Sequence, residues 1–326
     1  MPTTRNPRHG SMQYWPRKRA KRAYPRIRNY PKQDEPKVIG FAGYKVGMTH
    51  AVIVDNKKSS MTKGEEIVLP VSIIECPPLK AISIKLYKKS GKGLKAEGEI
   101  FSPEDKALAR RLRLPKKDAK AKIDNIKPEE YDDIRLQVCT QPGLTSLGKK
   151  KPEVFEIAIG GNDTKAKLEY AKQSLGKEIK VGDALKSGQQ VDIHAVTKGK
   201  GFQGPVKRFG VTLRSHKSEK GVRGPGNVGP WTGNRSWTVA HAGQMGYHSR
   251  MQRNGWIVKI SENAEGINPK GGVLRYGLVK NPYMLIRGSV GGASKRLVRI
   301  TPASRPDRTI PEEGPAVSST DTSSRQ

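Results

Sequence analysis

The stretch TKGKGFQGPVKRFG at 197–210 combines glycines and cations in a spacing that suits phosphate binding. Its residues 199–204 match G-x-G-x-x-G, the pattern of a dinucleotide-binding loop. Four cations surround these glycines: Lys198, Lys200, Lys207 and Arg208. Because glycine has no Cβ, backbone N–H groups there can approach phosphate oxygens closely, while the cations neutralise the phosphate charge. The loop therefore suits either a small phosphate cofactor or the backbone of a nucleic acid.

A dinucleotide site also requires a helix whose N-terminus meets the pyrophosphate. Pro205 can begin a helix here, but Gly210 and the β-branched residues after it end the pattern within about a turn and a half. A second G-x-G-x-x-G match, GPGNVG at 224–229, contains Pro225 and precedes Pro230, so no helix follows it. Both matches reflect a glycine-rich composition. We therefore expect no cofactor.

The same region holds three of the six histidines: His216, His241 and His248. A metal site would need Cys, Asp or Glu at fixed spacings, and Glu219 is the only acid between 197 and 255. No carboxylate is therefore at hand to orient a catalytic imidazole. We expect no metal and no catalytic residue, and we interpret these histidines as groups that stack on RNA or hydrogen-bond to it.

The charge of the whole chain points to a polyanionic partner. The sequence has 62 Lys and Arg against 30 Asp and Glu, a formal net charge of +32. A nucleic acid neutralises such a charge and gains from releasing its condensed counterions. A membrane surface would compete, but we find no basic amphipathic helix long enough to bind one. The longest apolar-rich stretch, IVLPVSIIECPPL at 67–79, is too short to span a bilayer.

The cysteines and the N-terminus indicate a cytoplasmic protein. Cys76 and Cys139 form no C-x-x-C pair, which argues against a zinc module and a disulfide framework. The N-terminus lacks the apolar segment of a secretory signal. It is rich in arginine, as a transit peptide is, but prolines recur through its first 31 residues and prevent an amphipathic helix.

The composition divides the chain into segments. Residues 1–36 hold ten Lys or Arg, no acid before Asp34 and interleaved aromatics, which predicts an extended basic arm. Residues 37–87 and 187–305 carry most of the β signal and flank a mixed α/β piece at 88–186. Residues 197–255, with 12 glycines and 11 Lys or Arg, lack a hydrophobic period, which is typical of a functional loop. The polar tail 306–326 is predicted to be disordered.

Within these segments we predict short strands and few helices. The predicted strands are VIGFA, HAVIV, IVLPVSII, KAISIKLY, IRLQVCT, EVFEIAI, QQVDIHAV, WIVKI, GGVLRYGLV, PYMLIRG and RLVRI. In KAISIKLY, Ile82, Ile84 and Leu86 would share one face. One helix should begin after Ser102, and another should run from about 163 to 175 and end at Gly176. The fold class is therefore mostly β, a small β-barrel interrupted by an α/β insertion.

Several long motifs resemble one known family. They are GYKVGMT (43–49), VTKGKGFQGPVKRFG (196–210), GNVGPW (226–231), HAGQMGYHSR (241–250) and GGVLRYGLVKNPYMLIRGSVGG (271–292). In this order they resemble the universal ribosomal protein L3 family of the large subunit. The stretch PRHGSMQYWPRKRAKR (7–22) is similar to the extension of its archaeal and eukaryotic branch. The resemblance covers the chain up to about residue 303.

This resemblance implies a translation-protein β-barrel on large-subunit rRNA, with neighbouring large-subunit ribosomal proteins as further partners. It also implies an early role in assembly and a finger, 197–255, that reaches towards the peptidyl transferase centre with Trp231 at its tip. His216 and Gln244 match positions that are methylated in different branches of the family.

We therefore predict a non-enzymatic, cytoplasmic rRNA-binding protein, with no DNA partner. The predicted rRNA contacts are Arg8, His9, Trp15, Arg17, Lys18, Arg19, Lys21, Arg22, Lys45, Lys198, Lys200, Phe202, Lys207, Arg208, His216, Arg223, Trp231, Arg235, Trp237, His241, Gln244, Tyr247, His248 and Arg250. The alternative from another class is an RNA-modifying enzyme with a basic arm, which would need a catalytic carboxylate or cysteine in a pocket. A DNA-compacting protein is a third reading and predicts tolerance of any duplex.

Overall fold

The computed structural model describes residues 8–102, 106–114, 126–217, 220–230, 233 and 238–323. The chain divides into two compact units. We call 1–23 with 196–249 the arm–loop unit, and 24–195 with 250–326 the main unit. Residues far apart in sequence build each unit.

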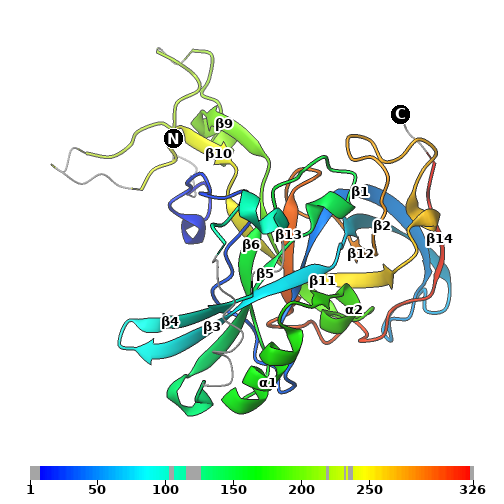
Figure 1. Cartoon of the computed structure of the whole chain (residues 1–326). Coiled ribbons are helices and arrows are strands. Elements are labelled where there is room, and N and C mark those ends of the chain that lie inside the picture. Colours follow the sequence, from blue (N-terminus) through cyan, green and yellow to red (C-terminus); the bar gives the residue numbers. More distant parts are fainter. Residues whose placement is uncertain are drawn as a thin grey trace. The chain divides into compact units, whose positions relative to one another are not determined.

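The main unit contains a seven-stranded sheet in the order β13-β8-β11-β12-β2-β1-β14 (Figure 1). Its strands are β1 (Phe41–Val54), β2 (Glu66–Glu75), β8 (Gln190–Val196), β11 (Ser249–Ser261), β12 (Tyr283–Arg287), β13 (Leu297–Pro302) and β14 (Val317–Thr320). β1 also pairs with β13, Phe41 lying opposite Ile300. Alternating apolar residues of these strands, such as Tyr44 and Trp256, are buried in the core. The predicted HAVIV strand lies within β1, whereas only the last two residues of VIGFA, Phe41 and Ala42, belong to that strand.

A second sheet of five strands follows the order β4-β3-β5-β6, with β7 paired to β3. Its strands are β3 (Leu79–Ser90), β4 (Gly93–Phe101), β5 (Asp133–Cys139), β6 (Val154–Ala158) and β7 (Glu178–Ile179). The predicted boundary at 87 differs from this arrangement, because β3 belongs wholly to the second sheet. Pro77 and Pro78 separate β2 from β3, and proline cannot donate to a strand ladder.

The prediction that Ile82, Ile84 and Leu86 share one face of β3 is confirmed only in part. Ile84 and Leu86 pack in the large core cluster, whereas Ile82 packs in a smaller cluster with Leu108. The pairing of β3 with β5 shifts register between Ala81 and Ser83. This irregularity at Ile82 breaks the period of two on which the prediction depended.

Helices are short and few in the described residues: α1 (Thr164–Ser174), α2 (Val181–Ala184) and α3 (Pro205–Phe209), with 3₁₀ turns such as Lys106–Arg110. The prediction of α1 is confirmed. The Asp163 side chain accepts a hydrogen bond from the Lys165 N–H at 3.0 Å, and Gly176 follows with φ 79°. The helix expected after Ser102 is a 3₁₀ turn where the structure describes it.

Two segments differ from their predictions. The predicted strand at 271–279 is a turn closed by the Val273 N–H to the Gly277 carbonyl, and positive φ values at Gly271, Gly272 and Gly277 prevent an extended chain. The predicted disordered tail contains β14, which pairs with the C-terminal half of β1. β14 is polar and has little apolar area to bury. It is ordered because its backbone hydrogen-bonds to an edge of β1 that would otherwise be unpaired.

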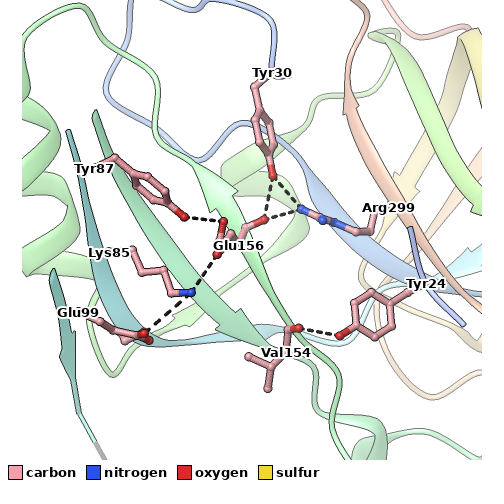
Figure 2. A network of polar contacts seen from close by, with 9 residues as sticks. Tyr24, Tyr30, Lys85, Tyr87, Glu99, Val154, Glu156 and Arg299 are labelled. Carbon is pink, nitrogen blue, oxygen red and sulfur yellow. Dashed lines mark hydrogen bonds and ion pairs between the residues drawn. The ribbon is translucent and has the colours of Figure 1, made fainter. Parts of the chain in front are cut away.

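Residues 24–39 also differ from the predicted arm of 1–36, because they pack on the main unit. The Tyr24 hydroxyl donates to the Val154 carbonyl at 2.9 Å, and the Tyr30 hydroxyl donates to the Glu156 carbonyl at 2.8 Å (Figure 2). The buried Arg299 guanidinium on β13 donates to the Tyr30 hydroxyl at 2.9 Å. We call residues 24–39 the strap. Its contacts join β6 of the second sheet to β13 of the first.

The Glu156 side chain extends this network on the second sheet. Its carboxylate accepts hydrogen bonds from the Lys85 ammonium at 2.9 Å and the Tyr87 hydroxyl at 2.8 Å (Figure 2). The Lys85 ammonium lies 3.9 Å from the Glu99 carboxylate on β4. Burial raises the pKa of Glu156, but these donors outweigh it and hold the pKa below its usual value. Lys85 and the two glutamates are thus paired with one another on the sheet that contacts the strap.

His194 on β8 supplies a pH-dependent contribution to stability. It lies opposite Arg299 in the β8–β13 pairing, and its Nε2 is 3.3 Å from the Thr301 hydroxyl. Burial, and then the Arg299 charge, lower the pKa of His194 to about 4, against a smaller opposing effect of Asp192.

We therefore expect the folded protein to lose stability as the pH falls from about 6.5 to about 4. The unfolded chain binds a proton on this histidine near pH 6.5, whereas the folded chain binds it only near pH 4. Urea unfolding at pH 7 and pH 5 measures the loss, and His194→Gln, which does not titrate, should lose less between the two. Equal losses in both proteins would contradict this assignment.

Candidate RNA-binding site

The glycine-rich loop of the arm–loop unit is built on a two-stranded sheet of β9 (Gly199–Gln203) and β10 (Gly243–Gly246) (Figure 1). Phe202 lies opposite Gln244, and Gly199 lies opposite Gly246. Gly246 has φ 72°, and a Cβ there would lie 2.0 Å from the Lys198 carbonyl oxygen. Only glycine fits this position. Without a Cβ, the backbone at Gly246 can lie against the backbone at Lys198.

The G-x-G-x-x-G segment lacks the loop and long helix of a dinucleotide-binding motif. Its residues 199–203 are in β9, and the helix α3 that follows has only five residues. Gly210 ends α3 in the left-handed conformation with φ 71°. The expectation that the helix beginning at Pro205 ends within about a turn and a half is confirmed. The second match, at 224–229, contains no helix, and none begins at the described residues just after it, 230, 233 and 238–242.

Arg208, at the end of α3, holds the loop together. Its Nε donates to the Gln244 carbonyl at 3.0 Å, and its Nη1 donates to the His241 carbonyl at 2.9 Å. A Cβ on Gly243 would lie 2.9 Å from the same Nη1. The guanidinium therefore braces β10 against α3, while its positive charge meets no carboxylate in the described part of this unit.

Aromatic rings and cations of the arm stack on α3. Trp15 and Phe209 are stacked with ring centroids 5.7 Å apart and planes 12° apart. The Arg17 guanidinium lies 4.6 Å from the Phe209 centroid and 5.6 Å from the Trp15 centroid. Arg8 adds a second cation at 5.7 Å from the Trp15 ring. Such cation–π contacts fix the cations in place without neutralising their charge.

His248 joins the arm to the loop through the backbone of Lys18. Its Nδ1 lies 2.8 Å from the Lys18 carbonyl oxygen, and its side chain is buried. The Ala20 N–H donates to the Tyr247 carbonyl at 2.8 Å, and the Arg19 guanidinium lies 5.5 Å from the Tyr247 ring. His248 therefore positions the arm, a different role from the predicted contact with RNA, and its side chain is largely buried.

A cavity of about 280 Å³ opens between these groups. It is lined by Arg17, Thr197, Lys198, Lys200, Arg208, Met245, Gly246 and His248. We call it the cationic pocket. Burial, and then the Arg17 charge, lower the pKa of Arg208. The lining therefore concentrates positive charge around an open space.

The predicted contacts fall into four groups. Exposed side chains are those of Arg8, Lys18, Arg19, Lys21, Arg22, Lys198, Lys200, Phe202, Lys207, His216, Arg223 and His241. Half-buried side chains are those of His9, Trp15, Arg17, Arg208, Gln244, Tyr247 and, at the start of β11, Arg250. His248 and Lys45 are buried. Trp231, Arg235 and Trp237 lie outside the described residues.

Lys45 differs from its prediction. It lies on β1 of the main unit, and its ammonium donates to the carbonyls of Val290 and Gly292, the latter at 3.2 Å. These bonds hold the 290–292 loop, so the lysine is directed into the protein. The GYKVGMT motif carries no local signal that distinguishes such a buried lysine from a surface one.

Phe209 is a site residue that the sequence analysis missed. It stacks on a tryptophan that precedes it by nearly 200 residues, so no local pattern could indicate the pair. The sequence does carry a weak signal. Phe209 is an apolar residue at the end of a short cationic helix, and the residues around it do not form an apolar face that it could extend.

Comparisons with known proteins are consistent over the whole chain. The family model for ribosomal protein L3 matches residues 1–326. The chain is 45% identical over 330 residues to "Large ribosomal subunit protein uL3" of Methanobrevibacter smithii, covering 98% of each chain. It is 46% identical to the protein of that name in Methanothermobacter thermautotrophicus, again over 98% of each. The corresponding protein of Archaeoglobus fulgidus is 48% identical over 93% of each chain.

Two negative findings apply to the described residues. None of the helices there has the length and apolarity needed to cross a membrane. No group of three or more His, Cys, Asp and Glu residues in that part of the chain is placed to hold a metal ion.

The family match over the full length and the archaeal relatives at 45–48% identity lead to one conclusion. The chain belongs to the ribosomal protein L3 family.

Proposed function

We propose that this protein is a structural constituent of the large ribosomal subunit, where it binds and organises rRNA. The observation that carries the proposal is the arm–loop unit, in which exposed lysines and arginines surround glycine-rich backbone. Residues 1–23 and 196–249 contain a single acid, Glu219. Such a surface repels itself in isolation and is stabilised by a polyanion. The names of the relatives, large ribosomal subunit proteins, support the same assignment.

The finger is the more detailed part of this proposal. We place the RNA-penetrating segment at 197–255, with Trp231 at its tip near the peptidyl transferase centre, as the family resemblance implies. In support, no residue of the described parts 211–217 and 220–230 is buried. A segment of that length with no buried residue of its own is suited to contact a partner. His216, which is exposed, and Gln244 remain the candidate modification sites.

The first sheet supports a small barrel as the platform for this finger. Each of β1, β2, β12, β11, β8 and β13 has a hydrogen-bonded neighbour on both sides. Such a ring of pairings favours closure and leaves only β14 outside it. Since β8 and β11 continue into the arm–loop unit, a barrel would hold both ends of the finger on adjacent strands.

The enzyme alternative finds no support. Cys76 and Cys139 are buried, and burial raises the pKa of the Cys76 thiol, which keeps it in the unreactive form. The family is one of ribosomal structural proteins, and the cationic pocket is lined by no carboxylate or cysteine.

Co-sedimentation tests the proposal directly. The tagged full-length protein, expressed in an archaeal host, should migrate with large subunits in a sucrose gradient and remain there in moderate salt. Nuclease treatment before the gradient should release it, because rRNA is the binding partner. A protein that stays at the top of the gradient, or that sediments equally with and without RNA, contradicts the proposed function.

A further inference from the structure

The cationic pocket combines features that a diffuse basic surface lacks. It is a concave space of about 280 Å³ with cations supplied by three separate segments: the arm, β9 with its preceding turn, and α3. Two of these cations, Arg17 and Arg208, are held by bonds to backbone carbonyls. Arg17 Nη1 donates to the Ser11 carbonyl at 3.3 Å, and Arg208 donates as described above.

The remaining two cations have exposed side chains at the pocket mouth. Lys198 and Lys200 lie on either side of Gly199, and neither ammonium has a hydrogen-bond or ion-pair partner among the described residues. Alternation along the extended chain places residues two apart on the same face. Both ammonium groups can therefore reach the same ligand at the mouth, while Arg17 and Arg208 add fixed charge to the same lining.

The arrangement is maintained at a cost in charge repulsion. The Arg17 charge acts on Arg208, and no carboxylate among the described residues of the arm–loop unit compensates either. A protein stabilised only by its own contacts would gain from an acid in this position. A bound anion removes the repulsion. The lining contains four cationic side chains and no carboxylate.

We propose that the cationic pocket binds one phosphodiester group of an RNA backbone, contacted by Lys198 and Lys200 and positioned by Arg17 and Arg208. This proposal rests on the proposed function and deepens it, because it separates groups that contact phosphate from groups that build the pocket. Phosphate contacts fix the position of a protein on RNA but carry no sequence information. The pocket therefore sets where the arm–loop unit sits, and bases are recognised elsewhere.

Two variants of equal charge test the proposal. K198Q/K200Q removes both cations at the mouth, and K217Q/K220Q removes two exposed lysines of the same unit that do not line the pocket. All four side chains are exposed, so both variants should have the same melting temperature as the wild type. Inorganic phosphate is titrated at constant ionic strength and followed by amide NMR. The Thr197 and Gly246 amides should shift saturably in the wild type and in K217Q/K220Q, and not in K198Q/K200Q.

The second arm of the experiment uses large-subunit RNA and distinguishes its backbone from free phosphate. In K198Q/K200Q the slope of log K against log salt should fall by about one relative to the wild type, for every RNA sequence bound. Saturable phosphate binding without this change would overturn the assignment to RNA and indicate a free phosphate compound. If the amide shifts do not saturate with phosphate, or if both variants have equal effects, the cations act as a diffuse positive surface and not as a binding pocket. In each of these cases a steep wild-type slope would leave the proposed function standing.

Discussion

The affinity of the protein for large-subunit RNA is expected to fall about 10³–10⁵-fold between roughly 50 and 200 mM monovalent salt, if six to ten phosphates are contacted. The reason is the concentration of cations in the arm–loop unit, where the described residues include no acid. Each neutralised phosphate releases condensed counterions, and added salt opposes that release. Filter binding or fluorescence anisotropy of the full chain over a salt series measures the slope.

A pair of variants localises the effect. Replacing the exposed arm lysines, K18Q/K21Q, should lower the slope by about two, since each lost phosphate contact lowers it by about one. The matched variant K63Q/K92Q removes two exposed lysines of the main unit and should leave the slope unchanged. A nearly flat plot for the wild type would refute electrostatic binding altogether. Equal slopes in the two variants would mean that the main unit contributes as much as the arm.

Replacing Glu75 with alanine is expected to destabilise the main unit by at least about 3 kcal/mol, since each buried donor left unsatisfied costs about 1–3 kcal/mol. The fully buried Glu75 carboxylate ends β2. It accepts bonds from the Lys280 N–H at 2.9 Å, the Asn281 N–H at 3.0 Å and the Asn281 side-chain amide at 2.8 Å. The Tyr276 hydroxyl donates to its other oxygen, and burial together with the Glu75 charge raises the pKa of Tyr276.

Glu75→Gln is the matched control for this prediction. Glutamine keeps one oxygen for the three N–H donors, and its amide can donate to the Tyr276 hydroxyl, so the predicted loss is only about 1 kcal/mol. Urea unfolding followed by tryptophan fluorescence reports on Trp256 in the same core. If alanine and glutamine lower the stability equally, the carboxylate does not organise the 276–281 segment as the contacts indicate.

Local signals predicted much of the fold. α1 is marked by Asp163 before it and Gly176 after it, and both act on their own near neighbours, so sequence alone was enough. The strand runs likewise follow β-branched residues. The failures arise where a distant segment decides the conformation. β14 is ordered by pairing with β1, and the 271–279 turn is held by Glu75, about 200 residues away.

The candidate site shows the same division. Charge and glycine content singled out the basic arm and the 197–255 segment, because composition is visible without a structure. They did not separate Lys198, which is exposed at the pocket, from Lys45, which is buried on carbonyls. Nor did they distinguish His248, which holds the arm through the Lys18 carbonyl, from the exposed His241. These distinctions depend on contacts between segments that the sequence does not place side by side.

The strap and its partner Arg299 constrain the order in which a newly made chain can fold. Tyr24 and Tyr30 are synthesised long before Arg299, which binds the Tyr30 hydroxyl. β1 likewise can pair with β13 and β14 only after more than 200 further residues have been made. The nascent main unit therefore remains incomplete, with an apolar strand edge open, until these distant segments have been synthesised. Since a highly basic chain in that state would bind any nearby RNA, it needs protection by a chaperone or rapid release to its own binding site.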